Sequence, residues 1–221
     1  MNIPTNTASD KPRVLLAHGS FDTKIGSEDR QYEGITLKEI ADMVRSPQTK
    51  EKADAAFIIP SSYRAHDGRK HSAQREHGLF HYLALDIDEG SPSLVDLKDA
   101  VKRVAGNAVA MIYSSSGASE DNRKWRVLIP LLEPISGADY GDTQLALFSL
   151  MGEQGITCDA ALARVGQPIY LPNVPPAKRD QHGQPLFYHQ DLHRGVGYLD
   201  VKNSSIWGEV QFRRQRAAIA E

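Results

Sequence analysis

Two aspartates stand one residue apart at the end of an apolar run, HYLALDIDEG, at residues 81–90. Side chains alternate between the faces of an extended strand, so Asp86 and Asp88 share one face, opposite Ile87. Like charges so close repel each other unless a cation lies between them, and hard carboxylate oxygens suit Mg²⁺ or Mn²⁺. A strand that runs into a solvated acidic turn has the same pattern, so the pair alone leaves both interpretations open.

Hydroxyl and cationic side chains follow in the next two apolar segments. Ser114, Ser115 and Ser116 end one segment, and Lys124 and Arg126 begin the next. Beside carboxylates, these groups predict a site for a metal-bound triphosphate, because the metal bridges phosphate oxygens while cations neutralise and hydroxyls orient the rest. In the alternative interpretation, the two cations cover an exposed strand edge and the tryptophan between them faces the core.

A third acidic residue, Asp159, follows a predicted helix and precedes Arg164 and a short apolar segment at 168–172. An isolated aspartate most often caps a helix or a turn. The same carboxylate would serve as a third metal ligand if the fold brought it to the other two. Both interpretations stay open on the sequence alone.

The segment 61–78 is polar, has no periodicity, and contains His66, His71 and His77. Their spacings give no common face and no cysteine is near, so the pattern favours a mobile, solvated loop over a zinc site. The basic residues of this loop are candidates for contacts with nucleic-acid phosphates.

Composition sets outer limits on function. The chain has 221 residues, 40% of them hydrophobic, and a net charge of −2, so no global positive charge indicates nucleic acid or a membrane. The single cysteine, Cys158, excludes an intramolecular disulfide and a multi-cysteine zinc site. No apolar run approaches the ~20 residues of a membrane span, and we expect a soluble, cytoplasmic protein.

The N-terminal part predicts two strands with a helix between them. Strands are expected at 13–18 and 55–60. Between them, Thr36 and Glu39 form a capping-box pattern that begins a helix, which should end at Ser46–Pro47. The apolar stripe of that helix consists of Leu37, Ile40, Ala41 and Val44.

From residue 82 to 172 the predicted order is strand, helix, strand, strand, helix, strand, which is the ferredoxin-like arrangement with a four-stranded antiparallel sheet. Ser91–Pro92 should begin the first of these helices, and the segment 168–172 should be the last strand. A terminal helix is expected at 205–221. This helix carries a cluster of three arginines, Arg213, Arg214 and Arg216. The cluster either binds template phosphates or forms a solvated helix face.

Three segments together resemble the archaeo-eukaryotic primase superfamily, in particular the primase-polymerase domains of phages, plasmids and integrated elements. LALDIDEG resembles the family's first motif, an apolar strand that ends in D-x-D. YSSSGASEDNRKWRVLIPL is similar in layout to the second motif, and CDAALARVGQPIYLPNVP to the third. The resemblance covers about residues 13–175, and the ordered trio is more specific than any single part.

The resemblance implies an α+β fold in a single primase-polymerase domain over 1–221. A small N-terminal α/β module (13–80) would pack on a ferredoxin/RRM-like βαββαβ catalytic module (81–175), with a C-terminal extension (176–221). It implies template-directed nucleotidyl transfer, as a DNA primase or DNA polymerase, in the cytoplasm of a bacterial or phage-infected cell. The implied partners are a single-stranded DNA template, NTP or dNTP, and a helicase in cis beyond this chain or in trans.

By the same resemblance, Asp86, Asp88 and Asp159 are the catalytic residues and hold two Mg²⁺ or Mn²⁺ ions. The nucleotide-binding residues would be Ser114, Ser115, Ser116, Lys124, Arg126 and Arg164. Ser116 stands where the family has a histidine that is taken to contact the phosphates, and we expect the hydroxyls and cations to hold the triphosphate instead.

Two alternatives stay open. The departure at Ser116 is compatible with a catalytically weakened primase-like module that binds single-stranded DNA or nucleotide. A phosphatase of the haloacid dehalogenase type would need a hydroxyl residue where Gly90 stands and a later acidic pair, which the sequence lacks.

Overall fold

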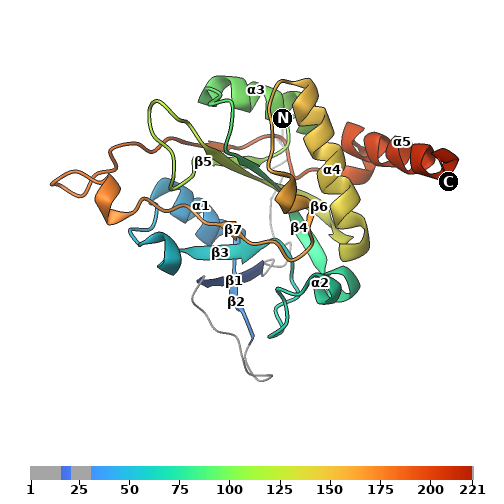
Figure 1. Ribbon diagram of the computed structural model, residues 1–221, viewed down its shortest axis with the longest axis horizontal. Helices are drawn as coiled ribbons and strands as arrows, with labels where there is room; N and C mark the ends of the chain where they lie inside the picture. The colour runs from blue at the N-terminus through green and yellow to red at the C-terminus, as the bar shows by residue number, and fades with distance from the viewer. Residues whose placement is uncertain (1–15, 21–30, 221) are drawn as a thin grey trace, which may run out of the picture.

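The computed structural model describes residues 16–20 and 31–220, which form a mixed α/β fold with two four-stranded sheets. Figure 1 shows the sheet of β1 (Leu16–Ser20), β2 (Glu33–Ile35) and β3 (Ala56–Ile59) below the sheet of β4 (Leu79–Ile87), β5 (Ala110–Ser114) and β6 (Trp125–Ser136). Helices α3 (Leu94–Ala105) and α4 (Gly137–Glu153) lie on the far side of the second sheet from the first. The arrangement leaves one core between the sheets and another beneath these helices.

The first sheet has the order β2-β1-β3-β7, with every pair antiparallel. Its strands are β1 (Leu16–Ser20), β2 (Glu33–Ile35), β3 (Ala56–Ile59) and β7 (Ile169–Tyr170). The strands expected at 13–18 and 55–60 correspond to β1 and β3, although residues 13–15 lie outside the described residues.

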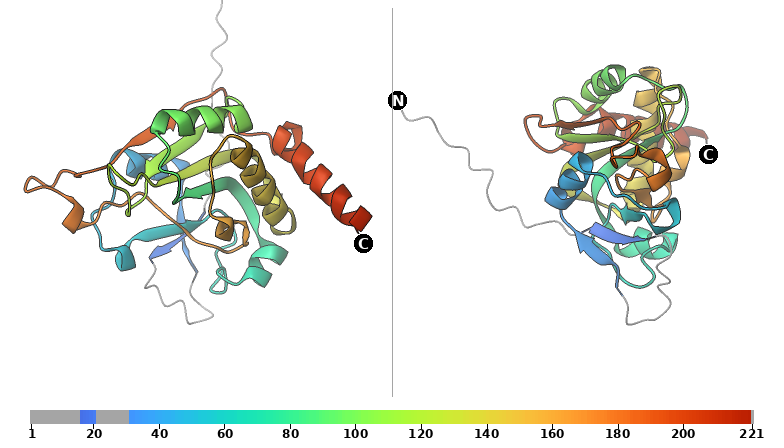
Figure 2. Two further views of the ribbon diagram at one scale, coloured as in Figure 1. Left: turned by 45° about the horizontal axis from the view of Figure 1, so that its top comes forward. Right: turned by 90° about the vertical axis from the view of Figure 1, so that its left-hand side faces the viewer.

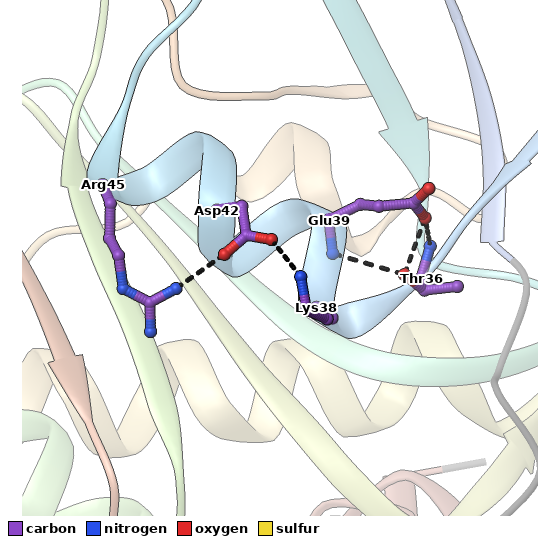
Figure 3. A network of polar contacts seen from close by, with 5 residues as sticks. All are labelled: Thr36, Lys38, Glu39, Asp42 and Arg45. Carbon is purple, nitrogen blue, oxygen red and sulfur yellow. Dashed lines mark hydrogen bonds and ion pairs between the residues drawn. The ribbon is translucent and has the colours of Figure 1, made fainter.

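Helix α1 (Leu37–Arg45) has the start that its sequence predicts. The Thr36 hydroxyl accepts from the Glu39 N–H at 3.2 Å, and the Thr36 N–H donates to the Glu39 carboxylate at 2.7 Å (Figure 3). One turn later, Asp42 pairs with both Lys38 and Arg45 on the exposed face. The capping box is confirmed because it depends only on residues within one turn of each other.

The second sheet has the order β4-β6-β5-β8 and is also antiparallel. Its strands are β4 (Leu79–Ile87), β6 (Trp125–Ser136), β5 (Ala110–Ser114) and β8 (Gln190–His193). β5 pairs with β6 in an antiparallel hairpin, as the ferredoxin-like arrangement predicts for the second and third strands of this module.

The prediction that residues 168–172 complete a ferredoxin-like sheet is wrong. That segment contains β7, which pairs with β3 in the first sheet, and β8 supplies the fourth strand at the opposite edge. In place of a strand, three segments bond the free edge of β4. The His81 N–H donates to the Pro60 carbonyl, and the Asp86 carbonyl accepts from the Asp159 N–H. Between them, the main chain of Ala84 bonds the Gln144 side chain. The β4 edge is therefore satisfied without a strand.

Alternation along β4 separates the two cores as predicted. Leu83, Leu85 and Ile87 are fully buried in the core beneath α3 and α4, whereas Tyr82 and Ala84 belong to the core between the sheets. Asp86 follows Ala84 on the same face. The carboxylate therefore points toward the first sheet rather than into the helix layer.

Two local predictions need correction. The segment 61–78 contains a helix, α2 (His71–His77), because Ala73 and Gln74 are buried against neighbouring elements and not left in a solvated loop. Helix α3 begins at Leu94 with Ser93 as its N-cap, two residues later than Ser91–Pro92 predicts. Ser91 has a positive φ of 45°, which is incompatible with a helix start.

The terminal helix is confirmed as α5 (Ser205–Ala220), which lies beside α4 and extends beyond the body of the molecule (Figures 1 and 2). Arg214 pairs with Asp139 and Asp142 of α4 at 2.8 Å, and Arg213 approaches Glu209 at 3.8 Å. These two arginines are engaged by the protein's own carboxylates, which favours the solvated-face interpretation of the cluster.

Candidate active site

The two aspartates lie where β4 ends and the chain turns toward α3. Asp86 is on the strand and half-buried, while Asp88 lies just beyond it and is exposed. Two hydrogen bonds from the start of β6 hold the turn after Asp88. The Trp125 indole N–H donates to the Pro92 carbonyl at 2.9 Å, and the Arg123 N–H donates to the Ser91 hydroxyl at 2.6 Å. The position of the pair thus depends on the start of β6.

Asp86 lies in a cross-strand row with Arg126 on β6 and Tyr113 on β5. Arg126 Nε is 3.4 Å from Asp86 Oδ2, and the guanidinium lies 5.6 Å from the centre of the Tyr170 ring on β7. The Tyr113 hydroxyl donates to the Tyr170 carbonyl at 2.8 Å. Arg126 therefore joins the two sheets from a central strand, which contradicts the interpretation that it covers an exposed edge.

Each aspartate faces one cation. Lys124 Nζ is 3.3 Å from Asp88 Oδ1, with the two side chains 26% and 49% exposed. The Arg126 and Asp86 side chains are only 10% and 16% exposed. The outer pair is screened by water and easily exchanged, whereas the inner pair is held by burial and by Tyr170.

Asp159 is brought to this site by its main chain. Its N–H donates to the Asp86 carbonyl at 2.8 Å, so the two residues are direct neighbours. Its carboxylate Oδ1 accepts from the Ala161 N–H at 2.9 Å and caps the short 3₁₀ helix η2 (Ala160–Ala163). The capping role is confirmed, and the metal-binding role stays a prediction.

Burial raises the pKa of Asp86 above the ordinary aspartate value. The positive charge of Arg126 opposes this shift, while the carboxylates of Asp88 and Asp159 add to it. Burial also raises the pKa of Cys158 to about 12, and the charge of Asp86 adds to that effect. Negative charge is therefore costly here, and a bound cation would relieve the cost.

The donor set fits a divalent cation in chemistry. Asp86 Oδ1 is buried and has no hydrogen-bond partner, which is costly unless another group binds it. Over residues 16–20 and 31–220, however, no three or more His, Cys, Asp or Glu side chains are already gathered as a metal site. Asp86 and Asp88 are instead paired with Arg126 and Lys124, so metal binding requires these side chains to rearrange.

The three serines differ in how they are engaged. Ser114 is buried, and its hydroxyl both donates to the His189 carbonyl at 3.2 Å and accepts from the His189 N–H at 3.0 Å. Ser115 is also buried, and its N–H donates to the Lys124 carbonyl. Ser116 is half-buried at the start of the β5–β6 loop. Contact between Ser114 and a phosphate would require breaking its bonds to His189, the residue before β8.

Arg164 is exposed at the end of η2, where its Nε donates to the Ala161 carbonyl at 3.3 Å. It therefore shares a turn with Asp159. Sequence reasoning missed two residues that shape this site, Tyr170 and Gln144. The signal for Gln144 was a polar residue within the buried stripe of α4.

No protein-family model matches the sequence, and no curated protein matches it. Among solved structures, the chain is similar to the AEP domain of the cyanophage S-2L primase-polymerase, with a TM-score of 0.48 and 12% sequence identity. The similarity covers 90% of this chain and 88% of that one. A likeness of this strength does not establish a shared activity, so function has to be inferred from this chain's own residues.

No helix in the described ranges has both the length and the apolar character that crossing a membrane requires.

Proposed function

We propose that this protein catalyses template-directed nucleotidyl transfer, as a DNA primase or DNA polymerase in the replication of a phage or mobile element. The observation that supports this best is the junction of β4 and η2, where the Asp159 main chain bonds that of Asp86 and where Asp86 and Asp88 pair with Arg126 and Lys124. Carboxylates from two separate segments with adjacent cations suit a metal-bound triphosphate.

In this proposal, Asp86, Asp88 and Asp159 hold two Mg²⁺ or Mn²⁺ ions. The ions, when bound, activate the attacking 3′ hydroxyl and neutralise the pyrophosphate leaving group. The unsatisfied Oδ1 atom of Asp86 and the raised pKa of its carboxyl group support a cation at this position. No covalent intermediate on the protein is required.

Lys124 and Arg126 have different tasks. Lys124 has a flexible, partly exposed side chain, so it can leave Asp88 and bind a phosphate once a metal neutralises that carboxylate. Arg126 is held between Asp86 and the Tyr170 ring, and it supplies a fixed positive charge beside the metals. Ser115, Ser116 and Arg164 complete the proposed triphosphate contacts, with a single-stranded DNA template and a helicase as partners.

The direct test is incorporation of labelled NTP or dNTP on a single-stranded DNA template with Mn²⁺. The wild type should incorporate nucleotides, and Asp88→Asn should lose at least about a hundredfold in rate because a metal ligand is gone. Asp191→Asn is a matched control, since Asp191 also pairs with a lysine, Lys98, at 2.9 Å and lies on β8, at the opposite edge of the sheet from β4. Equal loss in both variants would contradict the proposal.

A second candidate is a module that binds nucleotide or single-stranded DNA without chemistry. It is favoured by the absence of a histidine at Ser116 and by the absence of a preformed cluster of three metal ligands in the described residues. Binding of a labelled dNTP or oligonucleotide, without incorporation under any metal, would support this candidate over the polymerase.

A further inference from the structure

Gln144 lies on α4, is fully buried, and bonds the edge of β4 in the manner of a neighbouring strand. Its Oε1 accepts from the Ala84 N–H at 3.1 Å, and its Nε2 donates to the Ala84 carbonyl at 2.8 Å. Nε2 also lies 3.4 Å from the Leu162 carbonyl in η2. A single side chain therefore bonds two backbone segments that are far apart in the sequence.

These two segments carry the proposed metal ligands. Ala84 lies two residues before Asp86, and Leu162 lies three residues after Asp159. The hydrogen bond from the Asp159 N–H to the Asp86 carbonyl joins the same two segments a second time. Gln144, the end of β4 and η2 thus form one continuous set of hydrogen bonds.

Helix α4, which carries Gln144, is packed closely against both β4 and η2. The Tyr140 ring stacks on Phe80 of β4 with ring centres 3.8 Å apart. Gly141 lets η2 approach closely, because a Cβ atom at this position would lie 3.2 Å from the Ala163 carbonyl oxygen. The side chain of Gln144 is therefore presented from a helix whose distance to β4 and to η2 is already set.

We propose that Gln144 is the positioning residue that sets the spacing between Asp86 and Asp159, and so the geometry of the metal site; this rests on the function proposed above. Only an amide of this length provides the acceptor for the Ala84 N–H and the donors for two carbonyls at once. Residues that orient metal ligands commonly affect metal affinity by tenfold or more.

The test compares Gln144→Met with Gln74→Met. Gln74 is a matched control, because it is also fully buried on a helix and donates to two backbone carbonyls, those of Tyr63 and Gly68, away from the aspartates. Both variants should lose stability. Only Gln144→Met should speed hydrogen exchange at the Asp159 amide, by about tenfold or more in the metal-free protein, because that amide lies in the loosened segment.

The second readout is the affinity for Mn²⁺, measured by electron paramagnetic resonance. Gln144→Met should weaken binding about tenfold, and Gln74→Met should leave it unchanged. If Gln144→Met does not fold, Gln144→Asn, which keeps an amide on a side chain one methylene shorter, should show a change of the same kind. Wild-type exchange at Asp159 in a folded Gln144 variant would overturn the positioning role. Equal Mn²⁺ binding by wild type and Asp86→Asn would instead overturn the proposed function, while the exchange result still decides the role of Gln144.

Discussion

The main-chain N–H of Asp159 donates a 2.8 Å hydrogen bond to the main-chain carbonyl of Asp86. This bond lies at the edge of β4, where a ferredoxin-like sheet would have its fourth strand. Because η2 and not a strand fills that place, the main chain of the third acidic residue lies beside that of Asp86. The departure from the expected sheet is therefore also what brings the Asp159 main chain to the end of β4.

Removing the positive charge that faces Asp88 should strengthen metal binding. In Lys124→Met, the carboxylate loses a competing partner at 3.3 Å, so Mn²⁺ affinity should rise about two- to fivefold, the range of an exposed ion pair. Titration with Mn²⁺ followed by electron paramagnetic resonance measures this. Lys98→Met, which removes the partner of Asp191, is the control and should not change the affinity. Weaker Mn²⁺ binding in Lys124→Met would show that the two cations do not compete.

The stability difference between Asp86→Asn and the wild type should depend on pH. Burial raises the pKa of Asp86 in the folded state above the unfolded value near 3.8. The contribution of Asp86 to the free energy of unfolding is therefore fully present below pH 3.8 and is lost as pH rises through the folded pKa. Asparagine resembles the neutral form at every pH. Urea unfolding from pH 3.5 to 7 should show the variant gaining stability relative to the wild type as pH rises. A gain by the wild type would mean that the ion pair with Arg126 outweighs burial.

Two glycines of α4 should respond in opposite directions to alanine. A Cβ atom at Gly137 would lie 1.9 Å from the Gln74 carbonyl oxygen, so Gly137→Ala should lower the free energy of unfolding by about 2 kcal/mol or more. At Gly152, in the same helix, an added Cβ atom would have no neighbour within 4 Å. Gly152→Ala should therefore raise the free energy of unfolding by about 0.5–1 kcal/mol. Urea denaturation measures both. Similar effects at the two positions would contradict the close packing of α2 on α4.

Ser116→His should preserve or raise nucleotide incorporation, because an imidazole at this half-buried position adds a donor for the triphosphate. The measurement is the KM for the nucleotide in the template assay, which should stay equal or fall. Ser119→His, at an exposed position in the same loop, serves as the control. A large loss of incorporation in Ser116→His alone would indicate that the serine is adapted to its own site.

Much of the fold follows from local sequence patterns. The capping box of Thr36 and Glu39, the alternation around Ile87 and the pairing of β5 with β6 all depend on residues close together in the chain. Helix α2 was missed because its burial depends on contacts such as that of Gln74 with Gly68 and Tyr63 in a long surface segment. A short strand such as β7 carries no information about which sheet it joins.

The candidate site was predictable in its residue types but not in its contacts. The spacing of Asp86 and Asp88 indicates two carboxylates on one face. The position of Arg126 at the start of a later strand indicates a cation near them. The bond between Asp159 and Asp86 joins main-chain atoms, so no side chain indicates it. The cation–π contact of Arg126 with Tyr170 depends on β7 lying in the other sheet, which the sequence did not predict.

The central claim is that three carboxylates share divalent cations at the end of β4. The most direct measurement is a crystal structure of the protein with Mn²⁺, in which anomalous scattering locates the metal. We predict Mn²⁺ at about 2.1 Å from oxygens of Asp86, Asp88 and Asp159, with Lys124 turned away from Asp88. A structure in which Asp159 stays on the Ala161 N–H, out of reach of any metal at Asp86, or in which no metal binds there, would contradict the claim.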